Sequence, residues 1–196
     1  MKQAEIIASM TNEQLRVQVY LTQGLVLIVC GVLGYFIFDS LSDFTELFEW
    51  NISEILLFGI GPGFLVVAVD IGMYRFIPRE YWDDGGINEK IFTGSNIYQI
   101  LFLTVIVAIS EELLFRGLLQ PIIGYVATSL IFSLIHVRYL SKPLLFISVM
   151  VLSFTIGFLF EITNNLLVTI AMHFIIDFCL ALYIRFLGGT GNEEQL

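Results

Sequence analysis

Three ionisable residues, Glu111, Glu112 and Arg116, stand within six positions of each other in a stretch that is otherwise apolar. A carboxylate or guanidinium in such a stretch is costly unless it is paired or faces a wet cavity, so intramembrane charges indicate a functional site. Carboxylates can accept protons from water, bind metal ions or pair with cations. The sequence therefore points first to chemistry inside an apolar environment.

Residues of complementary chemistry occur in two later apolar stretches. His136 lies in one of them, and His173 and Asp177 lie in the other. His173 and Asp177 are four residues apart, so on a helix they share one face. Imidazole can orient water, donate to a developing oxyanion or hold a metal ion. Together with the glutamates, these residues have the types expected of an acid–base site.

Structural explanations compete with the functional ones. Glu112 and Arg116, also four residues apart, are best interpreted as an ion pair in which each charge offsets the burial cost of the other. Glu111 is turned by about 100° from Glu112 and can face a different neighbour. A single histidine among apolar residues would be explained by a hydrogen-bonded core position, whereas two with glutamates at one depth favour a site. Phe132 is interpreted as a packing residue that could also line the site.

The composition indicates an all-α, polytopic membrane protein. Of the 196 residues, 57% are hydrophobic and only 14% are charged. Apolar stretches approach the length of about 20 residues that crosses a bilayer as a helix. We expect a single transmembrane domain over residues 1–196, because no repeat or long linker divides the chain. Six spans are predicted, at about 17–38, 54–77, 98–121, 124–137, 143–160 and 165–186.

The distribution of basic residues predicts the orientation of these spans. The connections at 39–53, 122–123 and 161–164 contain no Lys or Arg, whereas the other connections do. Because Lys and Arg concentrate on the cytoplasmic side, both termini should be cytoplasmic. We expect an integral membrane protein of the bacterial plasma membrane, in contact with membrane lipid. The net charge of −9 and the lack of a basic patch argue against nucleic acid as a partner.

The depths of the polar residues in the predicted spans are compatible with one site. At a rise of about 1.5 Å per residue, Glu111 and His136 lie roughly 17 and 18 Å from the turn that joins their helices. His173 and Asp177 lie roughly 14 and 20 Å from the outer end of the last span. All four should therefore meet near mid-membrane. The span that ends at His136 is short, so its cytoplasmic end could dip into the membrane and admit water.

Three short motifs follow one another in separate apolar stretches: Glu-Glu-x-x-x-Arg at Glu111, Glu112 and Arg116, Phe-x-x-x-His at Phe132 and His136, and His-x-x-x-Asp at His173 and Asp177. In this order they resemble the motifs of the CAAX prenyl protease and bacteriocin-processing family, also called the Abi family. The resemblance covers about residues 98–180, which would form the catalytic core. It implies an intramembrane endopeptidase. Eukaryotic relatives remove the last three residues of prenylated proteins, and bacterial relatives are linked to peptide maturation and bacteriocin self-immunity.

The resemblance also implies roles for the residues. There is no serine or cysteine nucleophile with an obvious base partner, and no His-Glu-x-x-His zinc helix, so attack by water is the simplest chemistry. Glu111 would be the general base, His136 would position the water, and His173 would donate to the developing oxyanion. Many relatives have Asn where this chain has Asp177. An ionised Asp cannot donate, so an orienting or metal-binding role is favoured for it.

The cofactor and the function have alternatives. Glu111, His136, His173 and Asp177 could hold Zn²⁺, but the same groups suffice for hydrolysis without a metal, and we expect no cofactor. The expected substrate is a hydrophobic, lipidated or precursor peptide, because the site would be reached through the bilayer. A non-catalytic immunity or scaffold protein would keep the same bundle. A proton-coupled transporter is less favoured because the chain has no evident inverted repeat.

Overall fold

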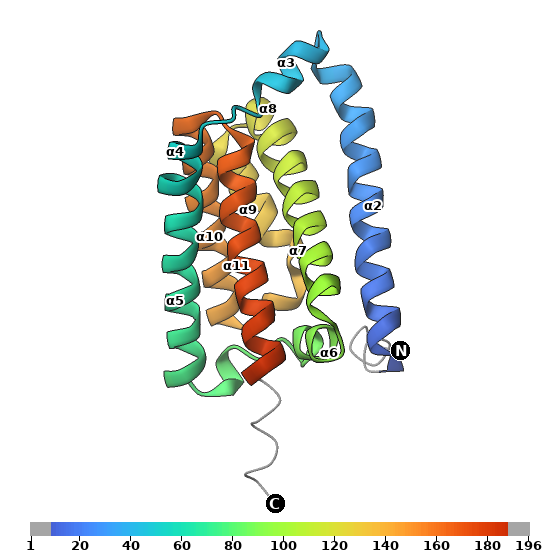
Figure 1. Cartoon of the computed structure of the whole chain (residues 1–196), viewed down its shortest axis with the longest axis vertical. Helices are drawn as coiled ribbons and strands as arrows, with labels where there is room; N and C mark the ends of the chain where they lie inside the picture. Colours follow the sequence, from blue (N-terminus) through green and yellow to red (C-terminus); the bar gives the residue numbers. More distant parts are fainter. Residues whose placement is uncertain (1–8, 188–196) are drawn as a thin grey trace, which may run out of the picture.

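The computed structural model describes residues 9–187 as a bundle of long helices, and these residues include no strand (Figure 1). The polytopic all-α fold predicted from the sequence is confirmed. Five helical stretches are long and apolar enough to cross a membrane: Asn12–Ile37, Ile52–Phe76, Ile97–Ile123, Pro143–Thr163 and Leu166–Phe186. The sixth expected span is a shorter apolar helix at Tyr125–Ile135.

The elements follow one another along the chain as α2 (Asn12–Ile37), α3 (Leu41–Glu46), α4 (Ile52–Glu54), η1 (Ile55–Ile60), α5 (Gly61–Phe76), η2 (Arg79–Tyr81), α6 (Ile87–Thr93), α7 (Ile97–Glu112), η3 (Leu113–Leu119), α8 (Gln120–Ile123), α9 (Tyr125–Ile135), η4 (Val137–Tyr139), α10 (Pro143–Thr163) and α11 (Leu166–Leu187). Here η2 and η4 are single 3₁₀ turns, whereas η1 and η3 are π-helical segments inside two of the long spans. The segment η3 begins directly after Glu112. π-Helical segments are rare and recur at functional sites, so this position is informative.

Helix α11 lies at the centre of the bundle and contacts α5, α7 and α10 (Figure 1). Small residues permit this close packing. A Cβ atom on Gly59 would lie 2.7 Å from the backbone oxygen of Val168, so η1 can approach α11 only with glycine at this position. Such contacts are typical of helix packing in membranes, where small residues let backbones come close. The packed helices enclose the cavity described below.

Helix α2 stands at the side of the bundle against α7 (Figure 1). Its N-terminus is closed by a capping box, in which Thr11 and Gln14 satisfy each other's backbone N–H groups. Most of its surface faces away from the other helices, and only Leu15, Gln23 and Cys30 are buried. An apolar exposed surface of this kind suits contact with lipid. The single buried amide of α2, on Gln23, is therefore notable.

The first residues of α2 and the last residues of α11 lie at the same end of the bundle, and α3 lies at the opposite end (Figure 1). This arrangement agrees with the predicted sidedness of the connections. The chain ends themselves, which the sequence predicts to be cytoplasmic, fall in 1–8 and 188–196 and lie outside the described residues. Which end of the bundle faces the cytoplasm stays a prediction.

Helix α9 is too short to cross a bilayer. Its 11 residues extend over about 16 Å, whereas the hydrocarbon core is about 30 Å thick. The helix ends at Ile135, with His136 as its C-cap, and the chain continues as the short turn η4. The backbone after His136 is therefore irregular, which membrane proteins tolerate where protein or a cavity surrounds it.

Candidate active site

One cavity brings together the polar residues that the sequence predicts to meet. All four, namely Glu111, His136, His173 and Asp177, line it together with Phe132, and its volume is about 860 Å³. They come from α7, α9 and α11 and the C-cap of α9, while α5 and α10 supply apolar walls. The side chains that the sequence places at similar depths in the membrane therefore line one cavity.

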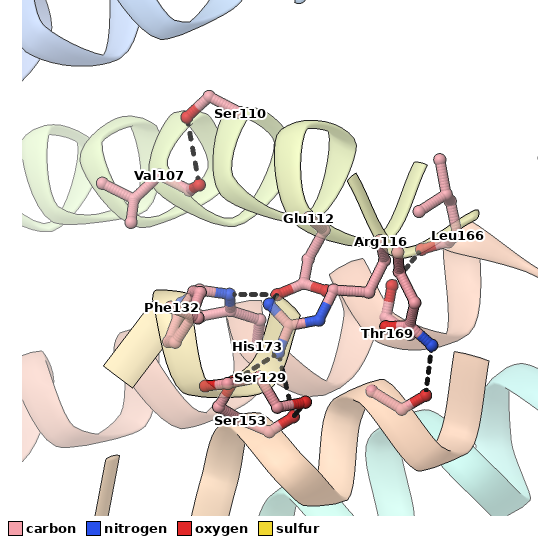
Figure 2. Close-up of polar contacts among 12 residues, drawn as sticks. Val107, Ser110, Glu112, Arg116, Ser129, Phe132, Ser153, Leu166, Thr169 and His173 are labelled. Atoms are coloured by element: carbon pink, nitrogen blue, oxygen red, sulfur yellow. Dashed lines mark hydrogen bonds and ion pairs between the residues drawn. The ribbon is translucent and has the colours of Figure 1, made fainter. Parts of the chain in front are cut away.

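Behind the cavity wall, Glu112 and Arg116 form the predicted ion pair. Glu112 Oε1 lies 3.4 Å from a terminal nitrogen of Arg116, and neither side chain has exposed surface. The same Oε1 lies 2.8 Å from Nδ1 of His173 on α11. Figure 2 shows the three side chains facing one another between these helices. The carboxylate of Glu112 thus links the ion pair to the cavity-lining histidine.

Arg116 ties η3 to two further helices. Its guanidinium donates to the backbone oxygen of Ser153 at 3.0 Å and to the hydroxyl of Ser153 at 3.1 Å, both on α10 (Figure 2). Its Cζ lies 4.6 Å from the ring centroid of Phe132 on α9. A guanidinium over an aromatic face is a favourable cation–π contact when both groups are desolvated. Arg116 therefore links η3 to α9 and α10 beside Glu112.

Phe132 has both roles considered from the sequence, since it is buried and also lines the cavity. Its ring centroid lies 4.9 Å from that of His136 and 6.2 Å from that of His173. The Phe115 ring packs against Phe132 in a T-shaped arrangement, with ring centroids 4.9 Å apart. The Phe132 ring therefore packs near both imidazoles.

Both ring nitrogens of His173 face carboxylates. Nδ1 is 2.8 Å from Glu112, and Nε2 is 3.5 Å from Oδ2 of Asp177, one turn along α11. An ionised carboxylate only accepts, so Nδ1 carries a proton and donates it to Glu112. The sequence suggested Asp177 as the residue that orients His173. The structure adds Glu112, which makes the shorter contact.

His136 is held by its own helix. Its Nδ1 lies 2.8 Å from the backbone oxygen of Phe132, and its ring stacks on Tyr139 with centroids 5.8 Å apart. A carbonyl oxygen can only accept, so Nδ1 donates. In the neutral imidazole Nε2 is then an acceptor, and it is free to bind a water molecule. The local fold at the end of α9 therefore selects the tautomer.

Glu111 precedes Glu112 and is turned from it by about 100° around the helix axis. Its side chain is half-buried, lines the cavity and accepts a hydrogen bond from Nε2 of Gln23 at 3.3 Å. It also interacts electrostatically with His136, His173 and Asp177. The contact with Gln23 on α2 was not expected from the sequence.

A zinc site would require at least three of the donor side chains to surround one point. Among residues 9–187, no group of three or more His, Cys, Asp or Glu side chains is placed so that it could hold a metal ion. Glu111, His136, His173 and Asp177 line the same cavity but do not converge on one point in this way. That the site works without a metal stays a prediction.

Comparison with known proteins gives two matches. Residues 93–179 match the family model described as type II CAAX prenyl endopeptidase Rce1-like, and this segment contains all three motifs. The uncharacterized protein YpbD of Bacillus subtilis is 42% identical over 166 residues, which cover 85% of this chain and 88% of YpbD. No solved structure matches. With this identity over most of both chains, and with the family match on the segment that forms the cavity, the chain belongs to the Rce1-like family of type II CAAX prenyl endopeptidases.

Proposed function

We propose that the protein is an intramembrane endopeptidase that hydrolyses a peptide bond with water activated by Glu111. The observation that carries the proposal is that Glu111, His136 and His173, from three separate motifs, line one cavity inside the helical bundle. The family match supports peptide hydrolysis as the reaction class. The two histidines also have fixed ring orientations, as positioning of reactants requires.

In the proposed reaction, Glu111 accepts a proton from a water molecule as the water oxygen attacks the peptide carbonyl carbon. Nε2 of His136, an acceptor in the neutral ring, binds the second hydrogen of the same water and holds its lone pair toward the substrate. The carbonyl π bond opens to an oxyanion. The proton on Glu111 is then given to the leaving amine as the carbon–nitrogen bond breaks, which restores the carboxylate.

His173 is proposed to stabilise the oxyanion. Because Nδ1 already donates to Glu112, Nε2 can offer an N–H to the oxyanion only when the ring is an imidazolium. Glu112 and Asp177 then supply a carboxylate at each ring nitrogen. Donors fixed in advance at the point where charge develops are the main source of such catalysis. Asp177 has an orienting and electrostatic role and is not a donor.

The proposed substrate is a hydrophobic, lipidated or precursor peptide. Apolar side chains of α5 and α10, such as Leu65, Val69 and Val151, form much of the cavity wall. A peptide with an apolar side chain or a lipid could occupy this part while its scissile bond reaches Glu111. We propose peptide maturation or bacteriocin self-immunity in a bacterial plasma membrane as the physiological role.

The test compares peptides from source cells that express wild type, Glu111→Ala or Glu46→Ala. Glu46 lies exposed on α3 and serves as the control for loss of a carboxylate. We expect peptides from secreted and membrane fractions to lose the same products in Glu111→Ala cells as in a deletion strain, while Glu46→Ala matches wild type.

Identical peptide profiles in the wild type and in Glu111→Ala would contradict proteolysis by this site. If the Glu111→Ala protein nevertheless supported immunity to a bacteriocin, a non-catalytic immunity or scaffold function would replace the proposal. Proton-coupled solute uptake that depends on Glu111 would favour the transporter alternative.

A further inference from the structure

We propose that Gln23 on α2 is a positioning residue that orients the carboxylate of Glu111 for water activation. The inference rests on the proposed function and extends it to a helix outside residues 93–179, the segment that matches the family model. It concerns a residue that belongs to none of the three motifs.

Gln23 occupies an unusual place. It lies near the middle of α2, and its side chain is buried although most of this helix faces away from the bundle. An amide away from water is costly unless both of its ends are hydrogen-bonded. Both ends are bonded here, and both bonds go to consecutive residues of α7, namely Ser110 and Glu111.

The contacts with Ser110 and with the Glu111 carboxylate together determine which end of the amide faces Glu111. The Ser110 hydroxyl lies 2.7 Å from Oε1 of Gln23, so it can donate to this oxygen and leave Nε2 directed at the carboxylate 3.3 Å away. A reversed amide would place its oxygen against a carboxylate oxygen, which is repulsive. The hydroxyl also lies 2.6 Å from the backbone oxygen of Ile106 and 3.1 Å from that of Val107 (Figure 2), so its single hydrogen is shared among three acceptors.

This contact matters because no cation within salt-bridge distance of Glu111 is present among the described residues. An N–H donor on one oxygen restricts rotation of the carboxyl group and leaves the other oxygen for water. Gln23 also lines the cavity, so it borders the space in which the water would sit. General-base catalysis depends on this geometry before anything else.

The alternative is that the amide simply joins α2 to α7, as polar side chains often do between membrane helices. The two roles make different kinetic predictions. A residue that only joins helices would change the melting temperature and the fraction of active protein. A residue that positions the base would change kcat in protein that is fully folded, with KM unchanged.

The experiment measures cleavage of a fluorogenic peptide with a farnesylated C-terminal CAAX sequence by the full chain in phosphatidylethanolamine and phosphatidylglycerol vesicles. Gln23→Met replaces the amide by an apolar group of similar length. We expect kcat to fall about tenfold, the effect of one hydrogen bond to a charged group, with KM within about twofold. Gln18→Met, the same change at an exposed position of α2, should leave both constants within about twofold of wild type.

Ser110→Ala gives a second, independent variant. Because the Ser110 hydrogen is shared, we expect a smaller loss in kcat, about threefold. The double variant Gln23→Met/Ser110→Ala should be no slower than Gln23→Met, since Ser110 acts through Gln23. Losses that multiply would show that the two residues act separately and would contradict the inference.

Glu111→Gln in the same assay separates the two proposals. If Glu111→Gln is inactive while folded Gln23→Met retains the wild-type kcat, the positioning role is wrong and the proposed function stands. If Glu111→Gln cleaves the peptide at the wild-type rate, the proposed function fails and the inference fails with it. If Gln23→Met does not fold, the kcat of Ser110→Ala decides the question.

Discussion

Replacing Glu112 by Gln should destabilise the protein far more than the same replacement at its neighbour Glu111. Glu112 is the counter-charge of Arg116, and both side chains are fully buried. Gln preserves the shape of the side chain and can still accept from Nδ1 of His173 through its amide oxygen. The change therefore removes the negative charge with little change in packing.

The magnitude follows from the charge left behind. Removing one partner of a buried ion pair costs about 3–5 kcal/mol, because the remaining ion is uncompensated. Arg116 keeps its two hydrogen bonds to Ser153 and its contact with Phe132, so we expect the lower end of this range. At about 2–4 °C per kcal/mol for a chain of this size, Glu112→Gln should lower the melting temperature by about 6–12 °C.

The assay is thermal unfolding of purified protein in detergent, followed by intrinsic fluorescence. Glu111→Gln is the matched control and should melt within about 2 °C of wild type, because no cation is left unpaired by it. The double variant Glu112→Gln/Arg116→Met should recover at least half of the loss, since it removes the unpaired cation. Equal melting temperatures for the two glutamine variants, or no recovery in the double variant, would refute the reasoning.

The remaining predictions concern chemistry, topology and packing. His136→Ala and His173→Ala should each lower kcat at least about 100-fold. Exhaustive chelation should leave the rate of cleavage by the wild type unchanged. Inactivation by a chelator that zinc reverses would contradict a metal-free site. Cys30 and Cys179 are first replaced, and a single cysteine is then placed at position 46. This cysteine should react with a membrane-impermeant reagent added outside the cell. Labelling only from the cytoplasmic side would show that the predicted orientation of the protein in the membrane is reversed. Gly59→Ala should lower the melting temperature, because the added Cβ would lie 2.7 Å from a backbone oxygen of α11. Gly72→Ala is the control and should leave the melting temperature unchanged, because its added Cβ would face open space. Equal effects of the two substitutions would contradict the close packing of η1 on α11.

The sequence predicts the spans well because their signal is local. Each predicted span overlaps a helix of the structure, with ends that differ by a few residues. The motifs could also be placed at one depth, since rise per residue is nearly constant in helices. The ion pair of Glu112 with Arg116 was predictable for the same reason, because four residues along a helix define one face.

The rotation of each helix and its neighbours could not be predicted in the same way. Helices that are apolar on all sides give no periodic signal for the buried face. The bond from Gln23 to Glu111 joins residues 88 positions apart, and the contact of Glu112 with His173 joins residues 61 apart. Such contacts depend on how α2, α7 and α11 pack, which is a property of the assembled bundle. Both Gln18 and Gln23 lie in the predicted span 17–38, so the sequence alone gives no reason to single out Gln23.

The two adjacent glutamates have different surroundings, although they follow one another on the same helix. Because neighbouring residues diverge by about 100°, Glu112 faces Arg116 and His173 in the buried interior while Glu111 faces Gln23 and the cavity. The Glu112 carboxylate is paired with the buried guanidinium of Arg116, which suits it to a structural role. The Glu111 carboxylate instead contacts the neutral amide of Gln23 and lines the cavity. Under the proposed mechanism Glu111 would act on water, whereas Glu112 would act only through its contact with the imidazole of His173.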